Sequence, residues 1–236
     1  MKKIAALLFA VPAVALADIG KISALEGAST RVGKDGKSEE LKVGTSVNLE
    51  DTLKAGGNVK LTLNDGSVIG LAKGSELKIT KADFEGQERK GDGFLGFLKS
   101  GSLWTNVKKA VGGAPFEVET ERAVAGVRGT IFRIDADALV KGAKVSRVMV
   151  KEGIVKVNPS NALKKQMSKQ VKKAGGKERT QVAGPQEVSA DDWEKKFVEL
   201  QANQQVVVGL DLWEAAEADQ KVHDDAFGKW ISGQQQ

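Results

Sequence analysis

The sequence contains no cysteine and no tyrosine, and His223 is its single histidine. A chain without cysteine forms no disulfide, has no thiol nucleophile and cannot make a zinc–thiolate site. His223 stands beside Asp224 and Asp225 in an acidic stretch, where a surface histidine is expected rather than a general base. No nucleophile-elbow, zinc-protease or phosphate-loop motif is present. The sequence therefore predicts a protein that is not an enzyme and that binds no cofactor.

A metal-binding pattern is missing as well. Asp135 and Asp137 have the spacing of two calcium ligands, but the rest of a calcium-binding loop, with its closing glutamate, does not follow them. Because the only histidine is far along the chain and no cysteine is present, no other combination of ligands suggests a metal centre. No metal site is predicted.

Long apolar runs are absent except at the N-terminus, where Met1-Lys2-Lys3 precedes the apolar residues 4–16. The run ends at Ala15-Leu16-Ala17, and a basic start, a short apolar stretch and a small-x-small site are typical of a secretory signal peptide. The alternative is a membrane anchor, but residues 4–16 are shorter than the roughly 20 apolar residues that span a bilayer. A lipoprotein anchor would need a cysteine. We therefore expect residues 1–17 to be a signal peptide, cleaved after Ala17, and the product to be periplasmic with no transmembrane segment.

Residues 18–158 are predicted to form a mainly β domain. The motif Val59-x-Leu61-x-Leu63 alternates with polar residues, which indicates a strand with one buried face, and Asn64-Asp65-Gly66 after it is typical of a turn. Further short apolar runs are separated by glycine. If the glycine corners stack strands in parallel coils, the fold is solenoid-like; if the turns are hairpins, it is a twisted β-sandwich. The polar segment 86–93 is expected to be a loop that divides the domain.

Residues 159–188 are predicted to be a basic linker. Seven basic residues crowd this segment, which has few large apolar residues: Lys164, Lys165, Lys169, Lys172, Lys173, Lys177 and Arg179. A charge run of this kind is usually solvated, as a linker or as an exposed helix. The alternative is contact with anionic lipid or cell-wall polymer, in which Lys164, Lys165, Lys172 and Lys173 would be binding residues.

Residues 189–236 are predicted to be an acidic helical tail, since residues 190–236 hold ten acidic residues against four basic ones. One helix is expected to carry Trp193, Phe197 and Leu200, whose spacing of i, i+4 and i+7 places them on one face. A second helix is expected to carry Trp213 and Trp230. These tryptophans are expected to dock the tail on the β domain; the alternative is an aromatic stripe that binds a partner protein.

Two side chains of the β region are candidate binding residues. Arg128, in the motif Val127-Arg128-Gly129-Thr130, is either a turn arginine that binds local carbonyl groups or a fork that binds an anion or a carboxylate. Trp104 is either a core residue or an exposed platform, and its neighbours Leu103 and Val107 favour the core.

Three stretches of the β region carry a family resemblance. In chain order they are Leu41-x-x-Gly44-x-x-Val47-x-x-x-Asp51-x-Leu53; Val59-x-Leu61-x-Leu63-x-Asp65-Gly66-Ser67; and Val127-Arg128-Gly129-Thr130-x-Phe132. With the segments around them they cover residues 19–158, and this region resembles the periplasmic domain of the FecR family. The resemblance implies a domain that receives a signal from an outer-membrane receptor and passes it to a cytoplasmic part that binds a sigma factor.

This sequence departs from the family plan, because an expected cleavable signal occupies the place of the cytoplasmic part and the membrane helix. Direct contact with a sigma factor is therefore not expected. The leading hypothesis is a periplasmic binding or scaffold module that contacts an envelope protein, such as an outer-membrane receptor or an assembly component. The alternative is a protein that binds an anionic cell-wall polymer or polysaccharide. Nucleic acid is not an expected partner of an exported protein, although the chain has a formal net charge of +5.

Overall fold

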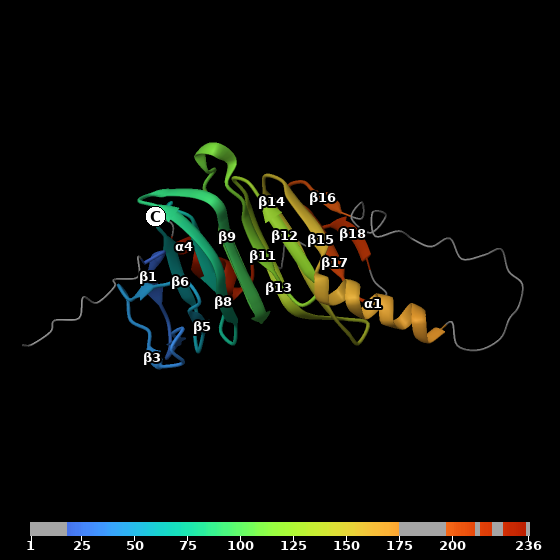
Figure 1. Ribbon diagram of the computed structural model, residues 1–236, viewed down its shortest axis with the longest axis horizontal. Helices are drawn as coiled ribbons and strands as arrows, with labels where there is room; N and C mark the ends of the chain where they lie inside the picture. Colours follow the sequence, from blue (N-terminus) through green and yellow to red (C-terminus); the bar gives the residue numbers. More distant parts are fainter. Residues whose placement is uncertain (1–17, 175–196, 211–212, 219–223, 235–236) are drawn as a thin grey trace, which may run out of the picture.

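The protein is a sandwich of two nine-stranded β-sheets. The computed structural model describes residues 18–174, 197–210, 213–218 and 224–234. In these residues two α-helices, α1 (Asn161–Ala174) and α4 (Ala226–Gly233), and a short helical turn, η1 (Val111–Gly113), accompany the strands. Figure 1 shows the strands of one sheet in front of those of the other, with α1 at one end. The mainly β fold predicted from the sequence is confirmed.

The two sheets are named A and B. Sheet A contains, from edge to edge, β18 (Trp213–Glu217), β17 (Gln204–Val208), β14 (Ala143–Glu152), β13 (Ile131–Val140), β10 (Ser102–Asn106), β7 (Val68–Leu71), β6 (Val59–Leu63), β1 (Gly20–Leu25) and β4 (Ser46–Val47). Sheet B contains β16 (Val198–Leu200), β15 (Val155–Pro159), β12 (Ala123–Val127), β11 (Phe116–Glu119), β9 (Glu88–Ser100), β8 (Glu76–Glu85), β5 (Thr52–Lys54), β2 (Thr30–Val32) and β3 (Ser38–Glu40).

The relative direction of neighbouring strands distinguishes a solenoid-like fold from a β-sandwich, the two alternatives that the sequence left open. Every pair of neighbouring strands in the described residues is antiparallel except β9 and β11, which are parallel. A solenoid of stacked coils would instead pair its strands in parallel, so the sandwich is the correct alternative. The chain passes repeatedly between sheet A and sheet B, adding one strand or one hairpin at a time, and from β1 to β18 it therefore advances along the long axis of the molecule (Figure 1).

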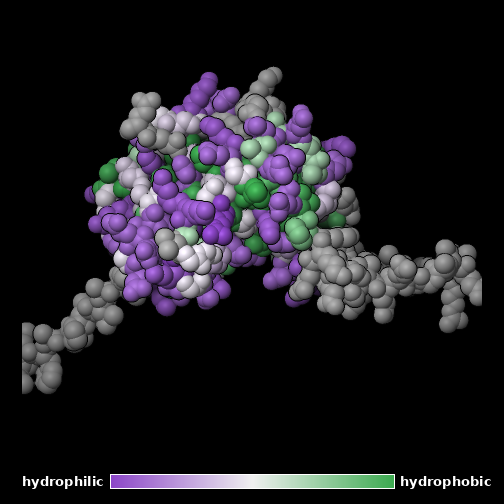
Figure 2. Space-filling view, turned by 90° about the horizontal axis from the view of Figure 1, so that it is seen from above, coloured by the Kyte–Doolittle hydropathy of each residue, from purple (hydrophilic) through white to green (hydrophobic). Residues whose placement is uncertain are grey.

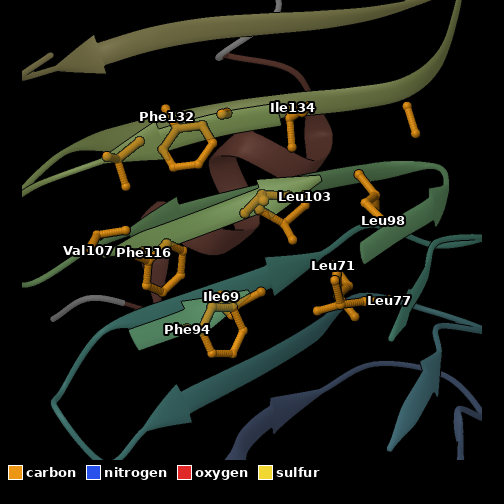
Figure 3. Close-up of a cluster of buried hydrophobic side chains, with 14 of the residues drawn as sticks. Ile69, Leu71, Leu77, Phe94, Leu98, Leu103, Val107, Phe116, Phe132 and Ile134 are labelled. Atoms are coloured by element: carbon orange, nitrogen blue, oxygen red, sulfur yellow. The ribbon is translucent and has the colours of Figure 1, made fainter. Parts of the chain in front are cut away.

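The main core lies between the sheets. In β6 the residues Val59, Leu61 and Leu63 are buried and the residues between them are partly exposed, as their alternation predicts. Figure 3 shows side chains of both sheets meeting in this core. Phe94 of β9 and Phe116 of β11 stack with ring centroids 4.6 Å apart. Burial of these aliphatic and aromatic side chains is the main term that stabilises the sandwich.

Segment 86–93 is not the loop that the sequence suggested. Only residues 86 and 87 form the turn, and β8 and β9 on either side pair as a long hairpin. The pairing register shifts at bulges, for example between Ile79 and Lys81. Most side chains near the turn are exposed, so polar residues fit there without preventing strand pairing. The prediction of a loop was wrong because glycine and polar residues are also common at the tips of β-hairpins.

The helical tail was also predicted wrongly for much of its length. Residues 198–217 contain β16, β17 and β18, which extend both sheets, and in the described part of the tail only α4 is helical. Val206 and Val208 are buried in β17, and β-branched residues with this alternation favour a strand. Leu200 is buried in β16, while Phe197 before it is half exposed. Trp193 lies outside the described residues.

The basic segment 159–188 contains helix α1, which starts directly after β15. Leu163 is buried and Met167 packs against the core, while Lys165 and Lys169 are exposed. This agrees with the exposed-helix reading of the segment. The proposed signal peptide, residues 1–17, lies outside the described residues. None of the described helices is long and apolar enough to cross a membrane.

Candidate functional site

Trp104 does not line the main core. It lies on the outer face of sheet A, where it is only 4% exposed and forms a separate cluster with Phe227 and Ile231 of α4. Trp230 is partly buried against the same cluster. In Figure 1 α4 lies behind the sheets, so it adds a third layer at this place. Trp104 is thus buried, as its neighbours favoured, but under a helix rather than between the sheets.

Four residues in one row across sheet A receive α4. Gly70 is the cross-strand neighbour of both Lys60 and Trp104, and Trp104 is the neighbour of Arg133. We call these residues, Lys60, Gly70, Trp104 and Arg133, the helix dock. A Cβ atom on Gly70 would lie 2.8 Å from Cδ1 of Ile231, so the absence of a side chain leaves room for the helix.

The two ends of α4 are fixed by charged residues of the dock. Asp225 caps the helix: its Oδ1 accepts a hydrogen bond from the N–H of Gly228 at 2.8 Å, and its Oδ2 accepts one from Nη1 of Arg133 at 2.7 Å. At the other end, Nζ of Lys60 donates to the carbonyl oxygen of Gln234 at 2.5 Å. Negative charge at the N-terminus and positive charge at the C-terminus both suit the helix dipole.

Arg133 is held in place by its own sheet as well. Its Nε donates to Oδ1 of Asp135 at 2.9 Å, and its guanidinium lies over the ring of Phe227, 5.6 Å from the centroid. Burial disfavours the charged form, but the carboxylates of Asp135 and Asp225 outweigh this effect and raise the pKa of Arg133. Arg133 therefore remains charged and links α4 to sheet A.

A shallow cleft of about 360 Å³ lies beside this ion pair. It is lined by Arg133, Asp135, Asp137 and Arg147, with the exposed Leu139 at its rim. Two arginines face two aspartates, so their charges balance. The cleft also holds the hydroxyl of Ser102, which accepts a hydrogen bond from Nη2 of Arg133 at 3.5 Å, so its polar groups are engaged with one another. Within the described ranges no group of three or more metal-ligating side chains is close enough to hold an ion.

Arg128 lies at one end of the sandwich, in the turn between β12 and β13. Its side chain is exposed and makes no hydrogen bond or ion pair with any other residue that the structure describes. Gly129 has φ 62°, and a Cβ there would lie 3.4 Å from Cβ of Lys109. The hydroxyl of Thr130 donates to the carbonyl oxygen of Ile154 at 3.0 Å. Three turns therefore meet here, and their exposed side chains are Arg128, Lys109 and Ile154.

We call this surface the loop end. Ile154 is 48% exposed, and Lys108 and Lys109 are exposed beside it. Figure 2 looks onto the molecule from above and shows hydrophobic side chains scattered among hydrophilic ones on the surface. The loop end thus combines positive charge with an exposed aliphatic side chain.

The remaining predicted residues are dispersed. Lys164 is partly exposed and Lys165 is exposed on α1. This helix also spans Lys172 and Lys173, whose side chains the structure does not describe. Trp213 begins β18 and packs partly against the main core. The structure therefore does not bring the lysines, Arg128 and the tryptophans into one site. Trp213 and Trp230 both contact the body of the protein, as the docking reading expected.

Two buried arginines were missed from the sequence. Arg89 of β9 is fully buried, and its guanidinium pairs with Asp65 in the turn between β6 and β7. It also donates to the carbonyl oxygen of Lys108 at 3.1 Å and lies 5.2 Å from the centroid of the Phe116 ring. Burial lowers the pKa of Arg89, and Asp65 opposes this effect. Arg133 could have been identified from the sequence, because it stands among apolar residues of a predicted strand, and a charged side chain that is buried there needs an ionic partner.

Comparison with known families places the dock and the loop end in one domain. Residues 51–156 match the family model described as FecR protein. The chain carries a FecR domain. The resemblance inferred from sequence motifs is thereby confirmed over these residues. Every dock residue and the loop end lie within the FecR domain, whereas α1, β16, β17, β18 and α4 follow it. The dock is therefore a contact between the FecR domain and the C-terminal segment.

Two crystal structures of a candidate anti-sigma factor from Parabacteroides distasonis ATCC 8503, at 2.50 and 1.65 Å resolution, are similar in structure. Each shares 22% sequence identity with this chain and covers 75% of it, with a TM-score of 0.46. The chain spans 62% of the length of the matched chains. A comparison with curated proteins gives no match.

Proposed function

We propose that this protein is an exported interaction module of the cell envelope, whose FecR domain binds another envelope protein in sensing or assembly. The observation that carries the proposal is the loop end, where exposed Arg128 and Lys109 flank the half-exposed Ile154. Arginine is enriched in protein interfaces and at their energetic centres, and an adjacent aliphatic side chain supplies apolar area. The FecR match over residues 51–156 supports a regulatory rather than an enzymatic role.

The chemistry of the loop end selects an acidic partner surface. The guanidinium of Arg128 presents a planar set of donors that fits a carboxylate through two parallel hydrogen bonds. Lys108 and Lys109 add positive charge that would steer such a partner. By contrast, Arg89 and Arg133 already bind carboxylates of this chain, so these buried arginines serve the fold.

Site-specific crosslinking in intact cells tests the proposal. A photo-crosslinking residue replaces Ile154 in one strain and Val43 in a control strain, because Val43 is an exposed aliphatic residue, 65% exposed, in the distant connection between β3 and β4. We expect one envelope protein to be captured from position 154 and not from position 43. Addition of Arg128→Gln should abolish this capture. Equal capture from both positions, or none from position 154, would contradict the proposal.

Export is tested separately. The mature protein is expected in the periplasmic fraction, and N-terminal sequencing should begin at Asp18, directly after the predicted cleavage site. A chain that keeps residues 1–17 and fractionates with the cytoplasm would contradict the envelope location. The location and the partner are thus tested by independent measurements.

A second candidate function is binding to an anionic cell-wall polymer, and helix α1 favours it. Lys165 and Lys169 are exposed, while Leu163 and Met167 anchor the helix to the body of the protein. Surface charges are screened by salt, so binding through lysines should be strong in low salt and lost at high ionic strength. Co-sedimentation with purified cell wall at both salt concentrations distinguishes this function, and Lys165→Gln with Lys169→Gln should reduce it.

A further inference from the structure

The contact between α4 and the helix dock has the form of a ligand in a binding site. The helix contributes an acidic N-cap, Asp225, and two apolar residues four positions apart, Phe227 and Ile231. These side chains make a cluster of their own with Trp104, apart from the main core. The last strand of sheet A along the chain, β18, ends at Glu217, before α4 begins. Separation of α4 would therefore break none of the strand pairings of the described residues.

The dock matches a helix of this length. Lys60, Gly70, Trp104 and Arg133 lie on four adjacent strands, which span about 14 Å at the usual strand spacing. The ten residues from Asp225 to Gln234 span about 14 Å at the rise of an α-helix. Charge complementarity is present at both ends, since Arg133 meets the acidic N-cap and Lys60 meets a C-terminal carbonyl oxygen. The middle of the dock is apolar and has the gap above Gly70.

Two further features distinguish the dock from an ordinary part of the core. Asp135, within the sheet itself, binds Nε of Arg133, so the orientation of Arg133 does not depend on α4 alone. In addition, α4 has eight residues, and isolated helices shorter than roughly 12 residues are unstable in water. The dock is therefore built into the FecR domain, while an isolated helix as short as its occupant is only marginally stable in water.

We propose that the helix dock is a binding site for a short amphipathic helix of a partner protein, and that α4 occupies it as an internal competitor. The partner segment has an acidic N-cap and large apolar residues at the second and sixth helical positions, as α4 has. This surface uses different residues from the loop end. Binding of the partner helix would displace the C-terminal segment, so the α4 contact is autoinhibitory.

A peptide-binding experiment with the full-length mature chain tests the proposal. The probe is a fluorescent peptide of residues 222–236, measured by anisotropy against the wild-type chain and against Ile231→Asp, which weakens α4 in its own dock. Occupancy by an internal competitor lowers apparent affinity by the fraction of free sites, so we expect the variant to bind at least about tenfold more tightly. A probe that itself carries Ile231→Asp is the matched control and should not bind. Addition of Trp104→Ala to the protein variant should abolish binding.

Three results would overturn the proposal. Equal or weaker binding by Ile231→Asp would mean that the dock closes when α4 leaves. Binding that persists with Trp104→Ala would place the peptide elsewhere. A wild-type chain that forms a dimer, with α4 exchanged between copies, would make a second copy the occupant instead of a partner. Circular dichroism of each variant confirms that the sheets remain folded, and the crosslinking at position 154 tests the loop end independently of these results.

Discussion

Asp65 and Arg89 form a buried ion pair that joins the two sheets. Asp65 lies in the turn between β6 and β7 of sheet A, Arg89 lies in β9 of sheet B, and their side chains are 6% and 0% exposed. Asp65 also holds its own turn, since Oδ1 accepts a hydrogen bond from the N–H of Ser67 at 2.8 Å. The Asp-Gly-Ser turn of the family motif is therefore an anchor between sheets as well as a hairpin turn.

Substitution Arg89→Met should destabilise the protein strongly. It leaves the buried carboxylate of Asp65 without its partner, and loss of one member of a buried pair costs about 3–5 kcal/mol of unfolding free energy. Urea denaturation measures the effect. Lys90→Met is the control, because the neighbouring Lys90 makes only an exposed pair with Glu88, and it should change stability by less than about 1 kcal/mol. Addition of Asp65→Asn to Arg89→Met should restore part of the loss; an equally unstable double variant would contradict the account.

The alternation of apolar and polar residues predicted strands such as β6, but nothing in the sequence predicted the ion pair between Asp65 and Arg89. The alternation of Val59, Leu61 and Leu63 identified β6, because burial on one face of a strand has a period of two residues. Arg89 gave no such signal, since it stands in a polar segment and its partner Asp65 is 24 residues away. Which distant residues meet is set by the order of strands in the sheets, and one sequence does not contain that order in readable form.

The tail shows a second limit of local pattern. The spacing of Trp193, Phe197 and Leu200 fits one face of a helix and so predicts a helix there. Val198–Leu200 is instead a strand, because it pairs with β15 at the edge of sheet B. The aromatic residues were informative in another way, because Trp213 and Trp230 do contact the body of the protein. The dock for α4 could not be foreseen, since its central feature is Gly70, where a side chain is missing.

Substitution Gly70→Val should loosen α4 and leave the sandwich intact. The new side chain would occupy the space of Ile231, and overpacking of this kind typically costs about 1–3 kcal/mol. Hydrogen exchange of the α4 amide groups should become faster, while exchange in β13 and β14 should not change. Gly126→Val is the matched control, because the nearest atom to a Cβ at that strand glycine is 3.8 Å away. If α4 stays protected in Gly70→Val, the gap above Gly70 is not required for docking.

Asp51 should make stability depend on pH in an unusual direction. Burial raises the pKa of Asp51 above its ordinary 3.8, although the N–H of Asn48 and the charge of Arg31 oppose the shift. Because the folded-state pKa is raised, the stabilising contribution of this group is present below pH 3.8 and is lost as pH rises through the folded-state value. Asp51→Asn removes this titration, so its stability relative to wild type should increase from pH 3.5 to pH 7.

Urea denaturation across this pH range measures the difference. Asp35→Asn is the comparison, because hydrogen bonding by Lys37 lowers the pKa of the exposed Asp35. A lowered pKa gives stability that is present above pH 3.8 and lost as pH falls, so the pH trend of Asp35→Asn relative to wild type should have the opposite sign. A relative stability of Asp51→Asn that decreases toward pH 7 would show that the pairing with Arg31 outweighs the cost of burial.

Substitution Arg128→Gln should separate binding from folding at the loop end. The side chain is exposed, so the unfolding free energy should change by less than about 0.5 kcal/mol. Capture of the partner from position 154 should nevertheless be lost, because glutamine carries neither the charge nor the planar fork of arginine. Gly153→Ala gives the contrasting case: Gly153 has φ 86°, and a Cβ there would lie 2.9 Å from the carbonyl oxygen of Gly129. That variant should lose both stability and capture. If Arg128→Gln lowers stability as much as Gly153→Ala does, Arg128 supports its turn and the loop end loses its central binding residue.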